Sequence, residues 1–218
     1  MIKIENVEVF GWESAIRGMR NPLNSWGKSD SVYGTYWGDI DGHECSDRDG
    51  FCIGSNDLDL MKKLIAAGSD HSKFMRMINV TLDITAPLYW WKEFDTYKVG
   101  TVRNSCSTMH KIHSKEFTLD DFSHEHLNDG SLNILDMTIY HLNAYRDEFL
   151  RTNDKNDWWQ MIQLLPSSYN QRATVQLTYA VLRNMYHSRK NHKLDEWRDF
   201  CKWIESLPYS ELITGDKK

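Results

Sequence analysis

An alternation of apolar and polar side chains over residues 78–85 constrains this chain more than any other feature. A period of two is typical of a β-strand with one buried and one polar face. Pro87 follows at once, and proline suits the first turn of a helix, because its missing N–H would have no helical partner there. Residues 78–85 are therefore predicted to form a strand that leads directly into a helix over residues 88–94. The apolar positions of the strand are Ile78, Val80, Leu82 and Ile84.

The rest of the chain is predicted to contain few strands and many helices. A second alternation, over residues 2–9, predicts a strand, whereas residues 104–107 are small and polar, as expected of a loop. Gly68 ends a helix that Ser55 or Asn56 caps. Further helices are predicted over residues 11–19, from residue 118, and over residues 132–149, 158–165, 175–185 and 194–204. This balance of elements indicates an α+β protein.

Residues 1–208 are predicted to form a single domain, which a chain of 218 residues is long enough to fill. Within it, residues 20–54 are rich in Gly, Ser, Asp and aromatic side chains and show no period. A segment of this length and kind is typical of a functional lid, an interface arm or a mobile insert. Residues 209–218 follow Pro208 and are expected to form a flexible tail.

The composition is that of an ordinary globular protein, 40% hydrophobic and 26% charged, with a net charge of -5. The negative charge argues against a general nucleic-acid-binding surface, although a local basic pocket for one phosphate is compatible with it. No apolar run is long enough to span a bilayer, and the N-terminus lacks the apolar core of a signal peptide. We therefore expect a cytoplasmic protein that binds neither nucleic acid nor membranes.

The four cysteines, Cys45, Cys52, Cys106 and Cys201, form no CxxC pair. Reduced thiols are the simplest interpretation for a cytoplasmic protein. His43 stands near Cys45 and Cys52, but this spacing fits no standard zinc site, so no metal is expected.

The order of parts in the middle of the chain matches that of a known family. A helix reaches Gly68 and His71 follows; after the predicted strand come Ala86-Pro87, a helix and a polar loop over residues 99–107. This order resembles the flavin-dependent thymidylate synthases, in which a helix ends in Gly-His and a strand leads through Ala-Pro into a helix that ends in Arg-His-Arg. The pattern of that family extends over residues 71–100 without a gap.

A second block of resemblance lies near the C-terminus. Residues 164–166, Leu-Leu-Pro, resemble a Leu-Pro step that precedes a long helix in the family, and the register then runs to Arg189 without a gap. After Arg189, His192 and Glu196 loosely match a His-Ala-Gln-x-Glu run, with one residue fewer. With both blocks, the resemblance covers roughly residues 57–204.

The resemblance implies a fold and an activity. The fold is a single α+β domain with a small antiparallel sheet and a bundle of long helices. The activity is the transfer of a one-carbon unit from methylene-tetrahydrofolate to dUMP with reduced FAD, with NADPH as a further co-substrate. In such chemistry the protein mainly orients the cofactor and the substrate. The sites of the family lie at subunit boundaries, so a homotetramer is expected.

The resemblance also assigns candidate site residues. Arg189 is expected to hold the nucleotide phosphate, and its plainer alternative is a helix-end arginine that the helix dipole stabilises. The activating Ser of the family falls at Cys106 without a gap, or at Ser107 with one inserted residue, and we expect Ser107 to be catalytic. Residues expected to face the flavin are His71, Tyr97, Lys98 and Asn184, and those expected to contact the substrate are Arg103, Asn104, Ser105 and Arg189.

Each of these residues also has an ordinary structural interpretation. A capping role for His71, a core position for Tyr97 and a solvated helix end for Lys98 are all common. A polar run such as residues 103–107 either binds a nucleobase edge or forms a solvated turn. The Cys106 thiol is a potential nucleophile, but without a lowered pKa an inert thiol is the more common role.

Several positions depart from the pattern of the family. Thr96-Tyr97-Lys98 replaces Arg-His-Arg, and an Asn and an Arg that face the flavin become Thr178 and Ala180. Lysine does not reproduce the bidentate hydrogen bonds of arginine to a phosphate. Each lost contact costs roughly 1.5–3 kcal/mol, so a second hypothesis stays open. It is a homologue that binds a nucleotide or a protein partner without flavin chemistry.

Overall fold

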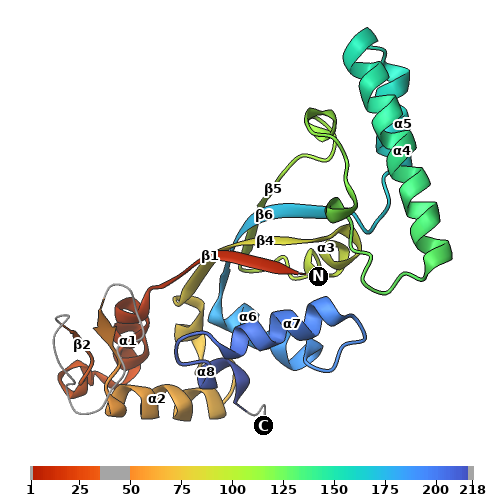
Figure 1. Ribbon diagram of the computed structural model, residues 1–218. Helices are drawn as coiled ribbons and strands as arrows, with labels where there is room; N and C mark the ends of the chain where they lie inside the picture. Colours follow the sequence, from red (N-terminus) through yellow and green to blue (C-terminus); the bar gives the residue numbers. More distant parts are fainter. Residues whose placement is uncertain (1, 35–49, 216–218) are drawn as a thin grey trace. The chain divides into compact units, whose positions relative to one another are not determined.

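The computed structural model describes residues 2–34 and 50–215 (Figure 1). These residues divide into two compact units, each made of several segments of the chain. Unit 1 comprises Met1–Glu5, Asp83–Thr96 and Arg103–Val175, and unit 2 comprises Asn6–Leu82, Tyr97–Val102 and Gln176–Lys218.

A four-stranded antiparallel sheet is the largest sheet in the described part of the chain. Its strand order is β1-β4-β6-β5, where β1 is Lys3–Phe10, β4 is Asn79–Pro87, β6 is Asn170–Thr178 and β5 is Thr101–Ser105. The predicted strand at residues 78–85 is thus confirmed as β4, whose apolar side chains at alternate positions are buried. Two short strands, β2 (Val32–Tyr33) and β3 (Phe51–Cys52), pair antiparallel in a separate sheet. The predicted α+β class with a small antiparallel sheet is confirmed.

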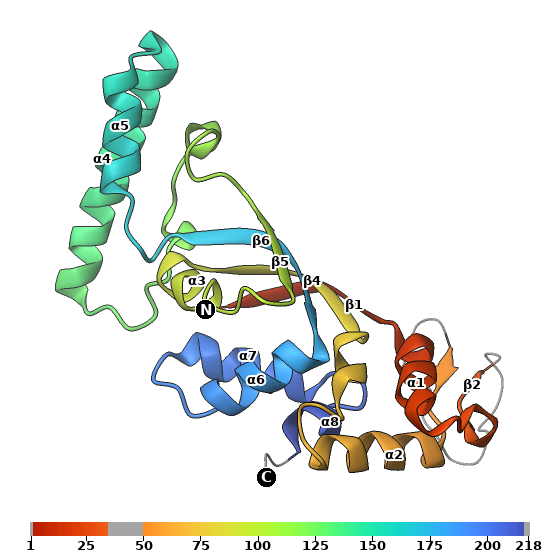
Figure 2. The ribbon, with the colours of Figure 1, turned by 180° about the vertical axis from the view of Figure 1, so that it is seen from behind.

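Unit 1 contains the long helices that the sequence predicts over residues 132–149 and 158–165. They are α4 (Asp129–Thr152) and α5 (Lys155–Leu164), which lie side by side in Figures 1 and 2. Their N-caps are Asn128, which accepts a hydrogen bond from the Ser131 backbone, and Asp154. The other helical elements of this unit are α3 (Leu88–Phe94) and the 3-10 turns η4 (Ile112–Ser114) and η5 (Leu119–Asp121). Helices α4 and α5 and the 3-10 turns of unit 1 share a hydrophobic core, whose buried residues are Ile112, Phe117, Phe122, Leu135, Leu142 and Met161.

Unit 2 is built from short helices around an aromatic core. Its helices are α1 (Trp12–Arg20), α2 (Ser55–Ala66), α6 (Tyr179–Arg189), α7 (Asp195–Glu205) and α8 (Glu211–Thr214), with 3-10 turns η1 (Asn21–Leu23), η2 (Trp26–Lys28) and η3 (Lys73–Arg76). Trp12 packs edge-on against Tyr179, and both side chains are buried. Burying large aromatic side chains of this kind contributes much of the stability of a domain.

The predicted helix over residues 175–185 is wrong in its first half. Residues 170–178 form strand β6, in which Ala173, Val175 and Leu177 are buried and alternate with exposed polar residues. The helix α6 begins only after Thr178, whose side chain accepts a hydrogen bond from the Val181 backbone. The period of two was present in the sequence but is short enough to be mistaken for part of a helical face.

The prediction of a loop at residues 104–107 is also corrected, because Asn104 and Ser105 belong to strand β5. Their polar side chains are exposed, as is possible on the terminal strand of a sheet. The expected flexible tail is wrong for residues 209–215, since Leu212 and Ile213 of α8 are fully buried. Helix α7 ends at Glu205, before Pro208, and the folded chain continues beyond this proline.

Cys52 is disulfide-bonded, so the prediction of reduced thiols is wrong for this residue, whereas Cys106 and Cys201 are free. His43 and Cys45, which were considered as zinc ligands, lie outside the described residues. Within the described ranges, no cluster of His, Cys, Asp and Glu is arranged to hold a metal ion. None of the helices described is both long enough and apolar enough to cross a membrane.

Candidate functional site

Arg189 and Tyr97 of unit 2, two predicted site residues, are in direct contact. Arg189 ends α6, and its Nε donates a hydrogen bond to the Tyr97 hydroxyl over 3.0 Å. The guanidinium carbon lies 5.0 Å from the centroid of the Trp197 ring and 5.7 Å from that of the Tyr97 ring. Trp197 is fully buried on α7, so it offers a rigid aromatic face to the cation. Arg189 is thus held in place by two aromatic side chains.

The thiol of Cys201 lies near Arg189 and has no catalytic character. Burial and the nearby Glu205 carboxylate raise the pKa of this thiol to about 12, although the charge of Arg189 acts in the opposite direction. A thiol with this pKa is protonated at neutral pH and is a poor nucleophile.

A pocket of about 350 Å³ lies between the end of α2, η3 and α6 in unit 2. Asn184, which was predicted to face a flavin, lines it together with Ser69, Ser72 and Arg76. Arg76 makes no hydrogen bond or ion pair with any residue in the described part of the chain and is exposed. The pocket therefore presents two hydroxyls, an amide and an uncommitted guanidinium, a donor set that suits an anionic group.

The chain turn that bears His71 forms one wall of this pocket. Gly68 adopts a φ of +113°, and its carbonyl accepts hydrogen bonds from the backbone N–H groups of His71 and Ser72, both over 3.1 Å. His71 itself is exposed. Ala180 lines the pocket as well, so the position at which the sequence departs from the Arg of the resembling family faces the same space as Asn184.

Lys98, the fourth residue predicted to face a flavin, is exposed and makes no hydrogen bond or ion pair with the residues described. It follows Tyr97 in a turn whose Gly100 has a φ of +79°. The structure thus places Tyr97 beside Arg189, and Asn184 beside the His71 turn, all within unit 2.

In unit 1, the predicted substrate residue Arg103 is engaged by other side chains. Its Nη1 donates to both carboxylate oxygens of Asp95, over 2.9 and 2.7 Å, and its Nη2 donates to Gln171 Oε1 over 2.5 Å. The guanidinium carbon lies 4.0 Å from the centroid of the buried Trp91 ring. This geometry is that of a positioning residue rather than of an exposed ligand contact.

Gln171 connects Arg103 to the segment that carries Cys106 and Ser107. Its Nε2 donates to the Cys106 carbonyl over 2.6 Å, and the Cys106 N–H donates to the Arg172 carbonyl over 2.9 Å. Sequence reasoning missed Gln171. The feature that could have identified it is a polar side chain at one of the alternate positions of strand β6 that are otherwise apolar and buried.

The hydroxyl oxygen of Ser107 accepts hydrogen bonds from the backbone N–H groups of Met109 and His110, over 3.2 and 2.8 Å. Its hydroxyl proton remains available to donate to a partner, since hydroxyls rotate to suit their surroundings. Asn104, Ser105, Cys106 and Ser107 are all exposed.

Comparisons with known proteins agree with this architecture. No protein-family model matches the sequence, and no curated protein matches it. Among solved structures, flavin-dependent thymidylate synthase ThyX from Helicobacter pylori, complexed with FAD and dUMP, matches with a TM-score of 0.66 and 17% identity. This match covers 97% of each chain. The UMP/dUMP methylase PolB from Streptomyces cacaoi, bound with 5-Br dUMP, matches with a TM-score of 0.60 and 11% identity, over 98% of this chain and 95% of that one.

The chain has the fold of these two enzymes. The fold that the resemblance implies is therefore confirmed, and the match covers nearly the whole length of the chain. At 11–17% identity the match shows the fold alone and does not by itself show an activity or a ligand for this chain.

Proposed function

We propose that this protein binds dUMP and FAD and transfers a one-carbon unit to the pyrimidine, as a flavin-dependent thymidylate synthase does. The observation that carries the proposal is the shared fold with an enzyme crystallised with FAD and dUMP, over 97% of both chains. The second neighbour is a methylase of UMP and dUMP, which supports the same class of substrate. The proposal includes methylene-tetrahydrofolate and NADPH as co-substrates and a homotetrameric assembly.

The pocket beside Asn184 fits a phosphate-bearing group such as FAD. Its donors are Ser69, Ser72, Asn184 and the uncommitted guanidinium of Arg76. The family has an arginine at the position of Ala180, and Arg76 lines the same pocket from a different element. Arg76 thereby offsets a charge-assisted contact that would otherwise cost roughly 1.5–3 kcal/mol. Bound FAD would supply the reducing equivalents of the reaction.

The proposal assigns separate roles to two predicted substrate residues, Arg189 and Arg103. Arg189 holds the nucleotide phosphate, and Tyr97 with Trp197 fixes the plane of its guanidinium. Arg103 acts through Gln171, which holds the backbone at Cys106, so that Ser107 is presented to the pyrimidine. Placing a reacting group within a small fraction of an ångström is a large part of what a protein contributes to such a reaction.

Flavin content is the first test. The purified protein should show flavin absorption, or should gain it on titration with FAD. A colourless protein that takes up no added FAD would refute the flavin part of the proposal. In that case calorimetric titration with dUMP decides between the second hypothesis, a nucleotide-binding homologue without flavin chemistry, and a protein that binds neither.

Arg76→Ala tests the pocket without disturbing the fold, because the side chain is exposed and unpaired among the residues described. FAD affinity should fall by about tenfold or more, as expected for loss of one charge-assisted contact. Lys73→Ala is the matched control, since Lys73 is an exposed cation on the same 3-10 turn and does not line the pocket. Equal affinity of the two variants would show that FAD binds elsewhere.

A further inference from the structure

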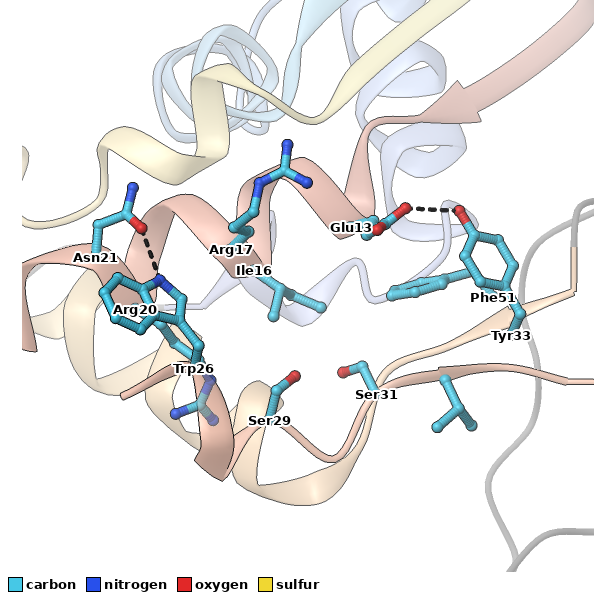
Figure 3. Close-up of a pocket in the computed structure, with 11 residues that line it drawn as sticks. Glu13, Ile16, Arg17, Arg20, Asn21, Trp26, Ser29, Ser31, Tyr33 and Phe51 are labelled. Atoms are coloured by element: carbon cyan, nitrogen blue, oxygen red, sulfur yellow. Dashed lines mark hydrogen bonds between the residues drawn. The ribbon is translucent and has the colours of Figure 1, made fainter. Parts of the chain in front are cut away.

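A second pocket, of about 630 Å³, lies in unit 2 between α1, η2 and the residues around strands β2 and β3 (Figure 3). It belongs to the segment before residue 57, outside the two blocks of sequence resemblance, and none of the residues assigned to FAD or dUMP lines it. Its volume is that of a small-molecule site. The lining residues that matter here are Ile16, Trp26, Ser29, Ser31, Tyr33 and Phe51.

Aromatic side chains stand at both ends of this pocket. Figure 3 shows Trp26 at one end and Tyr33 with Phe51 at the other, with Ile16 above the space between them. The Trp26 indole N–H donates to Asn21 Oδ1 over 2.8 Å, and the Tyr33 hydroxyl donates to Glu13 over 3.0 Å. Both rings are therefore oriented before any ligand arrives, which lowers the entropic cost of binding.

Trp26 and Tyr33 keep much of their surface exposed, 50% and 62% respectively, although both are large and apolar. Phe51 is 6% exposed and meets the Tyr33 ring edge-on, with 5.0 Å between centroids. Exposed aromatic faces around a concavity are typical of sites for flat ring systems, since ring stacking buries apolar area on both partners.

The two serine hydroxyls of the pocket can only accept hydrogen bonds from a ligand, whereas Arg17 and Arg20, which also line the pocket, carry donors. The hydroxyls of Ser29 and Ser31, which point toward each other in Figure 3, both donate to Asp57 Oδ2 over 2.7 Å. Asp57 is fully buried and paired with Arg20 Nε at 2.6 Å. Because a carboxylate accepts and never donates, it holds the protons of both hydroxyls, and only oxygen lone pairs remain for a ligand.

Asp57 stays ionised at neutral pH, so the hydrogen bonds from the Ser29 and Ser31 hydroxyls to its carboxylate are kept. Burial alone would raise the pKa of Asp57, but hydrogen bonds from Ser31, Ser29 and Arg20 outweigh burial, and the pKa is lowered. Ser31 also accepts from the Gly54 N–H over 3.0 Å, so Ser29 has the greater remaining capacity to accept.

We propose that this pocket is a second ligand site, which binds a planar heteroaromatic ring bearing an N–H donor, such as an amino-substituted purine or pteridine. The ring lies between Trp26 and the Tyr33–Phe51 pair, and its amino group donates to the Ser29 and Ser31 oxygens. The site is independent of the proposed FAD and dUMP contacts, and its occupant is recognised by stacking and by donor placement.

Calorimetric titration of the full-length protein with 9-methyladenine and with pterin tests this proposal, and the two ligands separate a purine source from a pteridine source. 9-Methylpurine, which has the same ring but no N–H, should bind at least about tenfold more weakly than 9-methyladenine. Binding of neither amino-substituted ring would overturn the proposal. Equal binding of 9-methylpurine would overturn the role of the serine oxygens.

Trp26→Ala should weaken binding by about tenfold or more, as expected for loss of one stacking face. Trp159→Ala is the matched control, because Trp159 is a similarly exposed tryptophan, at 42%, on helix α5. Should Trp26→Ala not fold, Val32→Trp fills the pocket from an exposed strand position and is expected to abolish binding. Unchanged affinity in a folded variant of either kind would place the ligand elsewhere and reject this site.

Discussion

The Nε of Arg189 donates a hydrogen bond to the hydroxyl of Tyr97 over 3.0 Å, although 92 residues separate the two in the chain. The resemblance assigned these residues different roles, a phosphate contact for Arg189 and a flavin contact for Tyr97. Their contact means that a substitution of Tyr97 changes the orientation of the Arg189 guanidinium as well as the local surface. A test of the role proposed for one residue is therefore also a test of the role proposed for the other.

Tyr97→Phe removes the acceptor for Arg189 and keeps the ring. We expect the free energy of unfolding to fall by about 1–2 kcal/mol and dUMP to bind more weakly, because Arg189 loses one fixed contact. Urea denaturation and calorimetric titration with dUMP measure the two effects. Tyr186→Phe is the control. It removes another tyrosine hydroxyl, which donates to Glu205, from α6, the helix that also carries Arg189. If both variants bind dUMP as the unaltered protein does, Arg189 does not hold the nucleotide through this pair.

Asp57→Asn should destabilise the protein strongly, because it leaves the Arg20 guanidinium buried without a counter-charge. Breaking a buried pair in this way costs about 3–5 kcal/mol in the free energy of unfolding. Asp59→Asn is the control, on an exposed position of the same helix. A loss below about 1 kcal/mol for Asp57→Asn would contradict the role assigned to the pair.

The lowered pKa of Asp57 also predicts a pH dependence. The carboxylate stabilises the folded state fully above the ordinary aspartate pKa of about 3.9, and this stabilisation is lost as the pH falls through the lower, folded-state pKa. The free energy of unfolding, measured in urea from neutral pH to about pH 3, should therefore decrease more steeply with acid in the unaltered protein than in Asp57→Asn. Parallel curves would show that Asp57 does not contribute.

Gln171→Leu should loosen the segment that carries Cys106 and Ser107. It removes the acceptor of Arg103 and the donor to the Cys106 carbonyl, and we expect a loss of about 1–3 kcal/mol. Amide hydrogen exchange at residues 106–110 should become faster. Gln176→Leu, at an exposed position of the same strand, should leave that exchange unchanged. Slow exchange in both variants would mean that Gln171 does not hold this segment.

Cys106 and Cys201 are predicted to differ in reactivity. Cys106 is exposed, whereas burial raises the pKa of the Cys201 thiol to about 12. Iodoacetamide should alkylate Cys106 in the native protein and reach Cys201 only after unfolding, as mass spectrometry of tryptic peptides would show. Labelling of both thiols at the same rate in the native state would be inconsistent with the packing of α7.

Substitutions of Gly11 and Gly68 separate the cost of backbone strain from the cost of steric overlap of an added Cβ. Both have positive φ, but a Cβ on Gly11 would overlap the Met77 carbonyl oxygen, whereas a Cβ on Gly68 would meet nothing within 4 Å. Gly68→Ala should cost about 1 kcal/mol from backbone strain alone, and Gly11→Ala about 1–3 kcal/mol more. Thermal denaturation of the two variants measures the difference, and equal melting temperatures would count against the packing at Gly11.

The candidate site was partly accessible from sequence. A register without gaps was enough to select Arg189 and Asn184, and the structure places each beside other residues that the resemblance selected, Tyr97 and the turn of His71. The sequence analysis did not select Arg76 or Gln171 as candidate site residues. No local sequence pattern distinguishes Arg76, and Gln171 is one polar residue within a strand. Their contacts form only when distant segments of the chain come together.

Local patterns in the sequence by themselves determined strand β4, the long helices α4 and α5, and the α+β class. These elements follow from periodicity, capping and turn residues, which act over a few positions along the chain. Tertiary structure decided that residues 170–178 form a strand, that Leu212 and Ile213 are buried, and that Arg103 is held by Asp95 and Gln171. The physical reason is that burial and hydrogen-bond satisfaction depend on partners far away in the chain, which no local pattern specifies.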